Sequence, residues 1–164
     1  VAPDLRSRSY QLDAHIQPSE GLITGVLIAH GDATSGYSLY LDEDGHLVHD
    51  LNIGGSHQIV RSPNPVPEGS TTLGFQMSRG TEGTTGVGSL LIDGSTVATH
   101  TTENIFFLMI SWSGLDIGLD RGTAVSLYQS PYAFSGELIK VTVNLVDDQT
   151  LDGNGVGKAE MMRE

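Results

Sequence analysis

The sequence predicts an all-β protein, built as an antiparallel sandwich or barrel, and three observations support this. Apolar residues recur at every second position in several short segments. Glycine is abundant, with 21 of 164 residues, and it stands in turns rather than at a fixed period. No long window repeats its apolar residues with the period of about 3.6 expected of a helix. About ten short strands, separated by turns at intervals of roughly 8–12 residues, suit such a fold.

The first strands follow from side-chain alternation. Residues 9–16 alternate between apolar and polar types, which predicts a strand with one buried face. Residues 25–30 are apolar on both faces, as central strands are. Residues 36–42 alternate again and place Tyr37, Leu39 and Leu41 on one side. The chain therefore begins with three strands that share a core.

Turn chemistry predicts how the middle of the chain is connected. Residues 39–48 form a predicted hairpin closed by Asp44-Gly45, because this pair accepts positive φ at a tight turn. Residues 63–69 contain three prolines, which cannot donate ladder hydrogen bonds, and are predicted to be a loop. Residues 71–78 then alternate with Leu73, Phe75 and Met77 on one face, which predicts another strand.

The second half repeats the design. Residues 86–92 are read as a strand that is apolar on both faces, and residues 90–97 as a hairpin around Asp93-Gly94. Residues 137–145 alternate and predict the last strand. The predicted organisation is one β-sandwich domain over 1–145 and a C-terminal extension over 146–164, with a short helix near 158–163. Because the chain starts at Val1 rather than Met, we expect a piece of a longer or processed protein.

Composition excludes several classes of function. Eight Lys+Arg against 20 Asp+Glu give a net charge of −12, which excludes a nucleic-acid-binding surface. With no cysteine, the chain has no disulfides, thiolate metal sites or cysteine nucleophile, and a cytoplasmic location is favoured although the compartment stays open. The longest apolar run, 105–110, has six residues where a membrane helix needs roughly 20, so no membrane partner is expected.

No catalytic residue is predicted. The sequence has neither a G-x-S-x-G elbow nor the E-x-D-x-x-E string of sandwich glycosidases. The acidic run 42–44 falls in a hairpin turn, where solvated carboxylates are ordinary. Aromatic residues are few, with Trp112 the only tryptophan. His46 and His49 would point to opposite faces of a strand, so the histidines are expected to be solvated rather than metal ligands.

Calcium is the one metal for which the sequence offers candidates. The glycine-rich segment 114–122 carries Asp116 and Asp120, four positions apart. Two carboxylates with backbone carbonyls and water could supply the 6–8 oxygens that Ca²⁺ prefers. The alternative is that Asp116 caps a strand, while Asp120 pairs with Arg121 or turns the loop. No cofactor is required by this interpretation, and Ca²⁺ stays open.

A series of motifs occurs in one order along the chain. G-Y-S-L-Y-L stands at 36–41 and is followed by D-G-H-L-V-H-D-L-N at 44–52. The further members are V-P-E-G-S-T-T-L-G-F at 66–75, G-V-G-S-L-L-I-D-G-S-T-V-A at 86–98, G-L-D-I-G-L-D-R-G-T-A-V-S at 114–126, F-S-G-E-L-I-K-V-T-V at 134–143 and A-E-M-M-R at 159–163. This series resembles the C-terminal β-sandwich domain of bacterial arylsulfatases.

The resemblance implies a concanavalin A-like jelly roll that serves as a non-catalytic accessory domain. Such a domain would pack on the sulfatase catalytic domain of the same parent chain, shape substrate access or mediate homo-oligomerisation. The C/S-x-P-x-R motif of sulfatases is absent, so the chemistry would belong to another part of the parent.

Two alternatives stay open. One is a lectin-like carbohydrate-binding module, recognisable by Trp112 or tyrosine side chains on a concave face beside calcium. The other is a free-standing sandwich enzyme, which would need two close carboxylates in one cleft.

Overall fold

The computed structural model describes residues 2–81, 84–105 and 114–149. Trp112 and the predicted helix near 158–163 lie outside these ranges. The division into a domain over 1–145 and an extension over 146–164 therefore stays a prediction. In the described ranges, no helix has the length and apolar character needed to cross a membrane.

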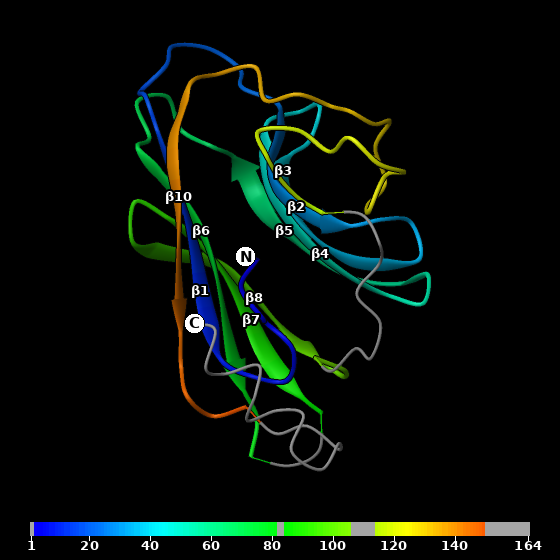
Figure 1. The fold of residues 1–164 in the computed structure, drawn as a ribbon. Coiled ribbons are helices and arrows are strands. Elements are labelled where there is room, and N and C mark those ends of the chain that lie inside the picture. Colours follow the sequence, from blue (N-terminus) through cyan, green and yellow to red (C-terminus); the bar gives the residue numbers. More distant parts are fainter. Residues whose placement is uncertain (1, 82–83, 106–113, 150–164) are drawn as a thin grey trace.

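The described residues form ten strands in two antiparallel five-stranded sheets, which confirms the all-β prediction (Figure 1). The first sheet has the order β10-β1-β6-β7-β8, and the second has the order β5-β4-β3-β2-β9. The strands are β1 (Tyr10–Ile16), β2 (Gly25–Gly31), β3 (Ser35–Leu41), β4 (His46–Ile53), β5 (Ser56–Pro65), β6 (Thr72–Arg79), β7 (Gly86–Ile92), β8 (Ser95–Thr102), β9 (Leu115–Ile117) and β10 (Leu138–Leu145).

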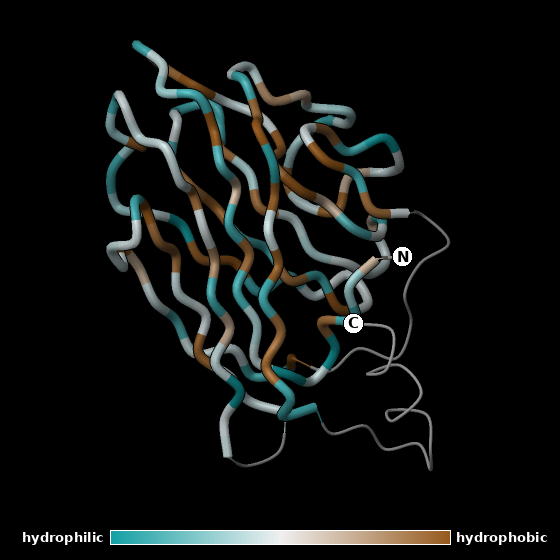
Figure 2. Tube along the Cα trace, turned by 60° about the vertical axis from the view of Figure 1, so that its left-hand side comes forward, coloured by the Kyte–Doolittle hydropathy of each residue, from teal (hydrophilic) through white to brown (hydrophobic). Residues whose placement is uncertain are grey.

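The core lies between the two sheets and is built from the alternating positions. Hydrophobic residues recur at every second position of β1 and β6, as the hydropathy colouring of the chain illustrates (Figure 2). Leu12 of β1 pairs with Phe75 of β6, and both are fully buried. Because burial of such side chains is the main favourable term in folding, the sequence alternation selects this two-layer packing.

Two strand predictions need correction. Residues 63–65 were expected to be loop, but they belong to β5, and Pro63 and Pro65 are tolerated because β5 is an edge strand. Strand β7 was expected to be apolar on both buried faces, yet Val87 is 44% exposed and the burial alternates. Strand β2, in contrast, is buried on both faces as predicted.

The expectation of solvated histidines is wrong for His49. Its side chain points into the core, and its ring stacks on Phe75 with centroids 3.4 Å apart. Neither ring nitrogen has a hydrogen-bond partner in the described part of the chain. Burial, with a small contribution from His100, lowers the pKa of His49 to about 3, so the ring is neutral. The alternation along β4, which also buries Leu47 and Leu51, places His49 there.

Candidate functional site

The outer face of the second sheet carries a second, smaller apolar cluster. Alternation in β3 sends Leu39 and Leu41 into the core and turns Tyr40 to the opposite face. Tyr40 packs there with Val26 and Val48, and all three are buried. A sheet face that is buried although it points away from the core must be covered by another part of the chain.

That cover is residues 118–135, here called the covering segment, drawn in yellow over β2 and β3 (Figure 1). Its backbone is hydrogen-bonded to β2 and to Thr24, the residue before β2. The Gly118 amide donates to the Leu27 carbonyl at 2.9 Å, and the Val26 amide donates to the Tyr132 carbonyl at 2.9 Å. The Ser135 amide donates to the carbonyl of Thr24 at 2.8 Å. These backbone bonds hold the beginning and the end of the segment on the sheet.

Side chains attach the covering segment to β3. The Tyr40 hydroxyl lies 2.9 Å from Ser126 Oγ, and the Tyr132 hydroxyl donates to the Leu41 carbonyl at 2.8 Å. Ser38 Oγ lies 3.0 Å from the hydroxyl of Tyr128. These bonds fix the ring positions of the tyrosines on the sheet.

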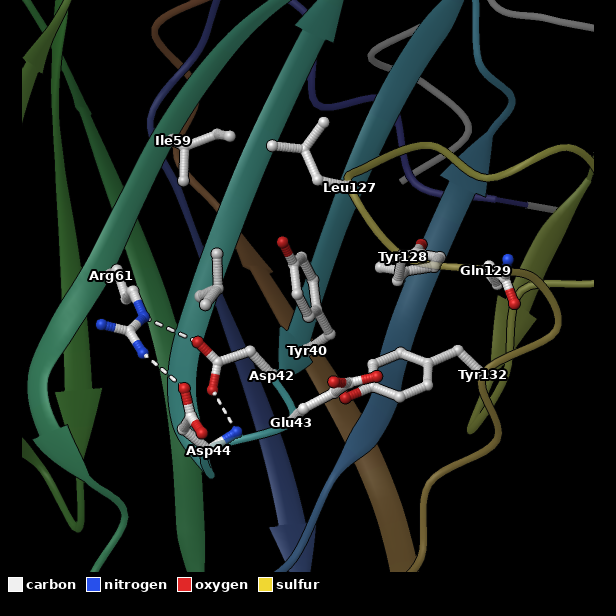
Figure 3. Close-up of a pocket in the computed structure, with 11 residues that line it drawn as sticks. Tyr40, Asp42, Glu43, Asp44, Ile59, Arg61, Leu127, Tyr128, Gln129 and Tyr132 are labelled. Atoms are coloured by element: carbon white, nitrogen blue, oxygen red, sulfur yellow. Dashed lines mark hydrogen bonds and ion pairs between the residues drawn. The ribbon is translucent and has the colours of Figure 1, made fainter.

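Between the covering segment and strands β3–β5 lies an open groove of about 650 Å³ (Figure 3). Three tyrosine rings form one side of it: Tyr40 and Tyr128 meet edge to face at 4.8 Å, and Tyr128 and Tyr132 stack at 5.3 Å. Leu127 adds an apolar side chain that is 73% exposed. The groove thus offers fixed aromatic surface next to solvent.

The turn between β3 and β4 supplies the charged rim of the groove. Asp42, Glu43 and Asp44 stand there, opposite Arg61 of β5 (Figure 3). Arg61 Nε donates to Asp42 Oδ2 at 2.6 Å, and an Arg61 terminal nitrogen lies 3.7 Å from Asp44 Oδ2. Burial would raise the pKa of Asp42, but the hydrogen bonds from Arg61 and from the His46 amide outweigh it and lower that pKa.

The tyrosines of the groove keep their phenolic protons at neutral pH. Burial raises the pKa of Tyr40 to about 12, against a hydrogen bond from Ser126. Burial also raises the pKa of Tyr132, and the carboxylates of Glu43 and Asp42 raise it further. The rings therefore act as neutral aromatic surface with hydroxyl groups.

A polar pair lies beneath the covering segment. Asp50 of β4 is fully buried, and His57 Nδ1 of β5 lies 2.5 Å from its Oδ2. Burial raises the pKa of Asp50, while hydrogen bonds to Ser126 and His57 oppose the rise. The pair thus supports the residues that hold the segment.

The two candidate calcium ligands lie in or beside the covering segment, but each carboxylate already has protein partners. Asp116 Oδ1 accepts from Arg121 Nε at 2.8 Å, and Asp116 Oδ2 accepts from the Arg121 amide at 2.8 Å. Asp120 Oδ2 accepts from the hydroxyl of Tyr128 at 2.5 Å and from the amide of Val125 at 3.1 Å. Arg121 therefore pairs with Asp116 rather than with Asp120.

Calcium at this place stays a prediction. Among the described residues there is no group of three or more His, Asp or Glu side chains arranged to hold a metal. A Ca²⁺ ion bound by both residues would have to share Asp116 with Arg121, which engages both of its oxygens, whereas at Asp120 the described part of the chain engages only Oδ2, through Tyr128 and Val125.

The groove was missed from sequence, although one signal for it exists. The alternation over 36–42 assigns Tyr37, Leu39 and Leu41 to the core, so Tyr40 must face the other way. An aromatic residue on the polar face of a strand indicates a cover or a ligand. Nothing in the sequence pairs it with Tyr128 and Tyr132, because they lie in a segment without periodicity.

Comparison with known proteins gives structural similarity only. No protein-family model and no curated protein sequence matches the chain. The CBM40 of Ruminococcus gnavus IT-sialidase, solved with α2,6-sialyllactose, matches with a TM-score of 0.57 and 17% identity over 90% of this chain and 80% of that one. The leech intramolecular trans-sialidase matches with a TM-score of 0.57 and 14% identity over 87% of this chain and 22% of that one. NanB matches with a TM-score of 0.60 and 12% identity over 94% of this chain and 24% of that one.

These similarities show the fold. The chain is a concanavalin A-like jelly-roll β-sandwich, as the sequence resemblance implied. They give no support to the arylsulfatase resemblance beyond that fold.

Proposed function

We propose that this chain is a non-catalytic carbohydrate-binding module that holds a sugar in the groove beside Tyr40, Tyr128 and Tyr132. The observation that carries the proposal is the combination of fixed aromatic rings with a rim of carboxylates in an open groove. Ligand sites in general join apolar and aromatic surface to a few convergent polar groups.

The chemistry of the groove suits a sugar. The faces of a pyranose ring carry C–H groups, which pack on aromatic rings, while its hydroxyls need hydrogen-bond partners. Carboxylates such as Asp42 and Asp44 accept strong hydrogen bonds from hydroxyls. Because the tyrosines are held by the protein, little side-chain freedom is lost when a ligand binds.

The structural neighbours support the same proposal over the accessory-domain interpretation. The Ruminococcus gnavus CBM40 was solved with α2,6-sialyllactose and also with α2,3-sialyllactose. The latter structure covers 97% of this chain at 16% identity. Since fold alone does not fix function, the groove residues and not the similarity decide the test.

Truncation of Tyr132 is expected to weaken glycan binding about tenfold or more, as loss of a central aromatic anchor does. The measurement is a glycan array followed by calorimetric titration of the best ligand. Tyr132→Phe keeps the ring but loses the hydroxyl that donates to the Leu41 carbonyl, so it should weaken binding by about threefold, much less than Tyr132→Ala. Tyr132→Ala should lose the affinity.

The controls separate binding from folding. Leu127→Ala removes an exposed groove side chain and should weaken binding about threefold with no change in unfolding temperature. Ile139→Ala removes an exposed side chain on β10 of the other sheet and should leave affinity unchanged. If no glycan binds, with or without added calcium, the proposal is wrong. Loss of binding on addition of a chelator would show that the bound state needs a divalent cation, and loss of that effect in Asp116→Asn or Asp120→Asn would place the ion at these residues.

The second candidate is the accessory domain of an arylsulfatase, and it depends on the ordered motifs between residues 36 and 163. In that case the catalytic domain of the same parent chain is the partner and this chain hydrolyses no sulfate ester. The test is the encoding gene. A reading frame that joins this chain to a C/S-x-P-x-R sulfatase domain supports the candidate, and a frame without one contradicts it.

A further inference from the structure

The groove proposed above as the sugar site has an unbalanced charge. Its lining residues include three carboxylates, Asp42, Glu43 and Asp44, and one guanidinium, Arg61, which leaves a formal charge of −2. The whole chain carries −12, so no distant positive field opposes it. A ligand that enters the groove therefore meets negative potential.

Arg61 is already paired with carboxylates of the acidic turn. Its Nε donates to Asp42 at 2.6 Å, and a terminal nitrogen lies 3.7 Å from Asp44. A ligand carboxylate that bound the remaining N–H groups of Arg61 would lie close to Asp42 and Asp44, which already neutralise the guanidinium. The like charges would repel it.

A cation finds the opposite conditions. Glu43 and Tyr132 line the same groove (Figure 3), and the charge of Glu43 adds to burial in raising the pKa of that tyrosine. Aromatic faces attract cations through the ring quadrupole, and nearby carboxylates add direct Coulomb attraction. The stacked rings of Tyr128 and Tyr132 and the acidic turn lie on the same groove.

We infer that the groove selects glycans by charge: it prefers amino sugars with a free, protonated amine, and it disfavours sialylated and other anionic glycans. This inference rests on the proposed function, because it assumes that the groove is the sugar site. It predicts a specificity opposite to the sialyllactose bound by the Ruminococcus gnavus structures.

Matched ligand pairs test the inference. Oligomers of glucosamine and of N-acetylglucosamine of equal length differ by amine charge, and lactose and sialyllactose differ by one carboxylate. At low ionic strength and about pH 6, where a sugar amine is protonated, we expect the amine member to bind about fivefold or more tightly than its acetylated partner. Lactose should bind at least as tightly as sialyllactose.

Two variants assign the selectivity to the acidic turn. Glu43→Gln and Asp44→Asn each keep the side-chain shape and remove one charge, so each should reduce the amine-to-acetyl ratio by about twofold to threefold. Glu137→Gln changes the same charge on an exposed residue next to β10, away from the groove, and should leave the ratio unchanged.

The outcomes are distinguishable. If a broad glycan panel shows no binding at all, the proposed function fails and this inference fails with it. If glycans bind but no amine-bearing member exceeds its acetylated partner, or sialyllactose exceeds lactose, the charge selectivity alone is wrong. The inference of charge selectivity is also wrong if Glu43→Gln and Asp44→Asn leave the amine-to-acetyl affinity ratio unchanged.

Discussion

Gly25→Ala is expected to lower the free energy of unfolding by roughly 3 kcal/mol, through positive-φ strain and overpacking together. Gly25 has φ +105°, and a Cβ there would lie 2.2 Å from the Ala133 carbonyl oxygen and 2.6 Å from Phe134 Cα. Both contacts are with backbone of the covering segment, so that segment must move. Because it carries Tyr128 and Tyr132, glycan affinity should fall as well. Urea unfolding and titration of the best glycan measure the two effects.

Gly21→Ala is the matched control. Gly21 also has positive φ, +82°, but nothing lies within 4 Å of the Cβ position. It should therefore cost only about 1–2 kcal/mol of backbone strain and leave glycan affinity unchanged. Equal losses of stability and affinity in the two variants would show that contact with the covering segment does not matter.

His49→Leu is expected to flatten the acid sensitivity of the fold. The pKa of His49 is about 3 in the folded protein against 6.5 as its ordinary value, so between these values the unfolded chain binds the proton that the folded protein excludes. Proton binding at His49 therefore costs no stability above about pH 6.5, and between about pH 6.5 and pH 3 it costs about 1.4 kcal/mol per pH unit. Leucine removes this loss and two buried, unpartnered ring nitrogens.

The measurement is chemical unfolding of parent and variant from about pH 7 to pH 4. Near pH 7 the variant should be equally or slightly more stable, and by about pH 4.5 its advantage should grow by roughly 2–3 kcal/mol. Leu51→Val, at a buried position two residues along β4, should lose about 1 kcal/mol at every pH. If the difference between parent and His49→Leu does not change with pH, His49 is not the buried, neutral group described here.

The strands were predictable because their signals are local. The hairpin around Asp44-Gly45 needs only an alternating pattern and a turn that accepts positive φ, and Gly45 has φ +79°. The prediction of a loop at residues 63–65 was wrong because it depended on a property that is not local. A proline has no amide hydrogen to donate, and this can be seen in the sequence. Whether a strand tolerates the missing donor depends on whether it lies at the edge of the sheet, and that is decided by the tertiary structure.

The candidate site was only partly predictable. Its acidic turn was found, but as a solvated turn, because the covering segment and Arg61 reach it only through the fold. The calcium candidates show a similar limit: Asp116 and Asp120 were recognised as carboxylates in a glycine-rich segment, yet their partners Arg121 and Tyr128 are set by the path of that segment. The sequence shows which residue types are present and how they are spaced, but their contact partners depend on how the chain packs.

The burial of His49 was predictable in principle. The same alternation that places Leu47 and Leu51 in the core also places the residue between them there. The residue type favoured a solvent-exposed position for His49, because histidine is more often at least partly exposed. The ring of Phe75 supplies a stacking partner that only the opposite sheet could provide.

The two edge strands of the second sheet determine whether another chain can add a strand to it. Strand β9 at one edge has three residues, and β5 at the other carries Pro63 and Pro65, which have no amide hydrogen to offer. Short strands and prolines are the means by which sheets avoid edge-to-edge aggregation. An extended peptide therefore cannot readily add itself as a sixth strand of this sheet. Recognition at these edges is therefore expected to use side chains more than backbone pairing.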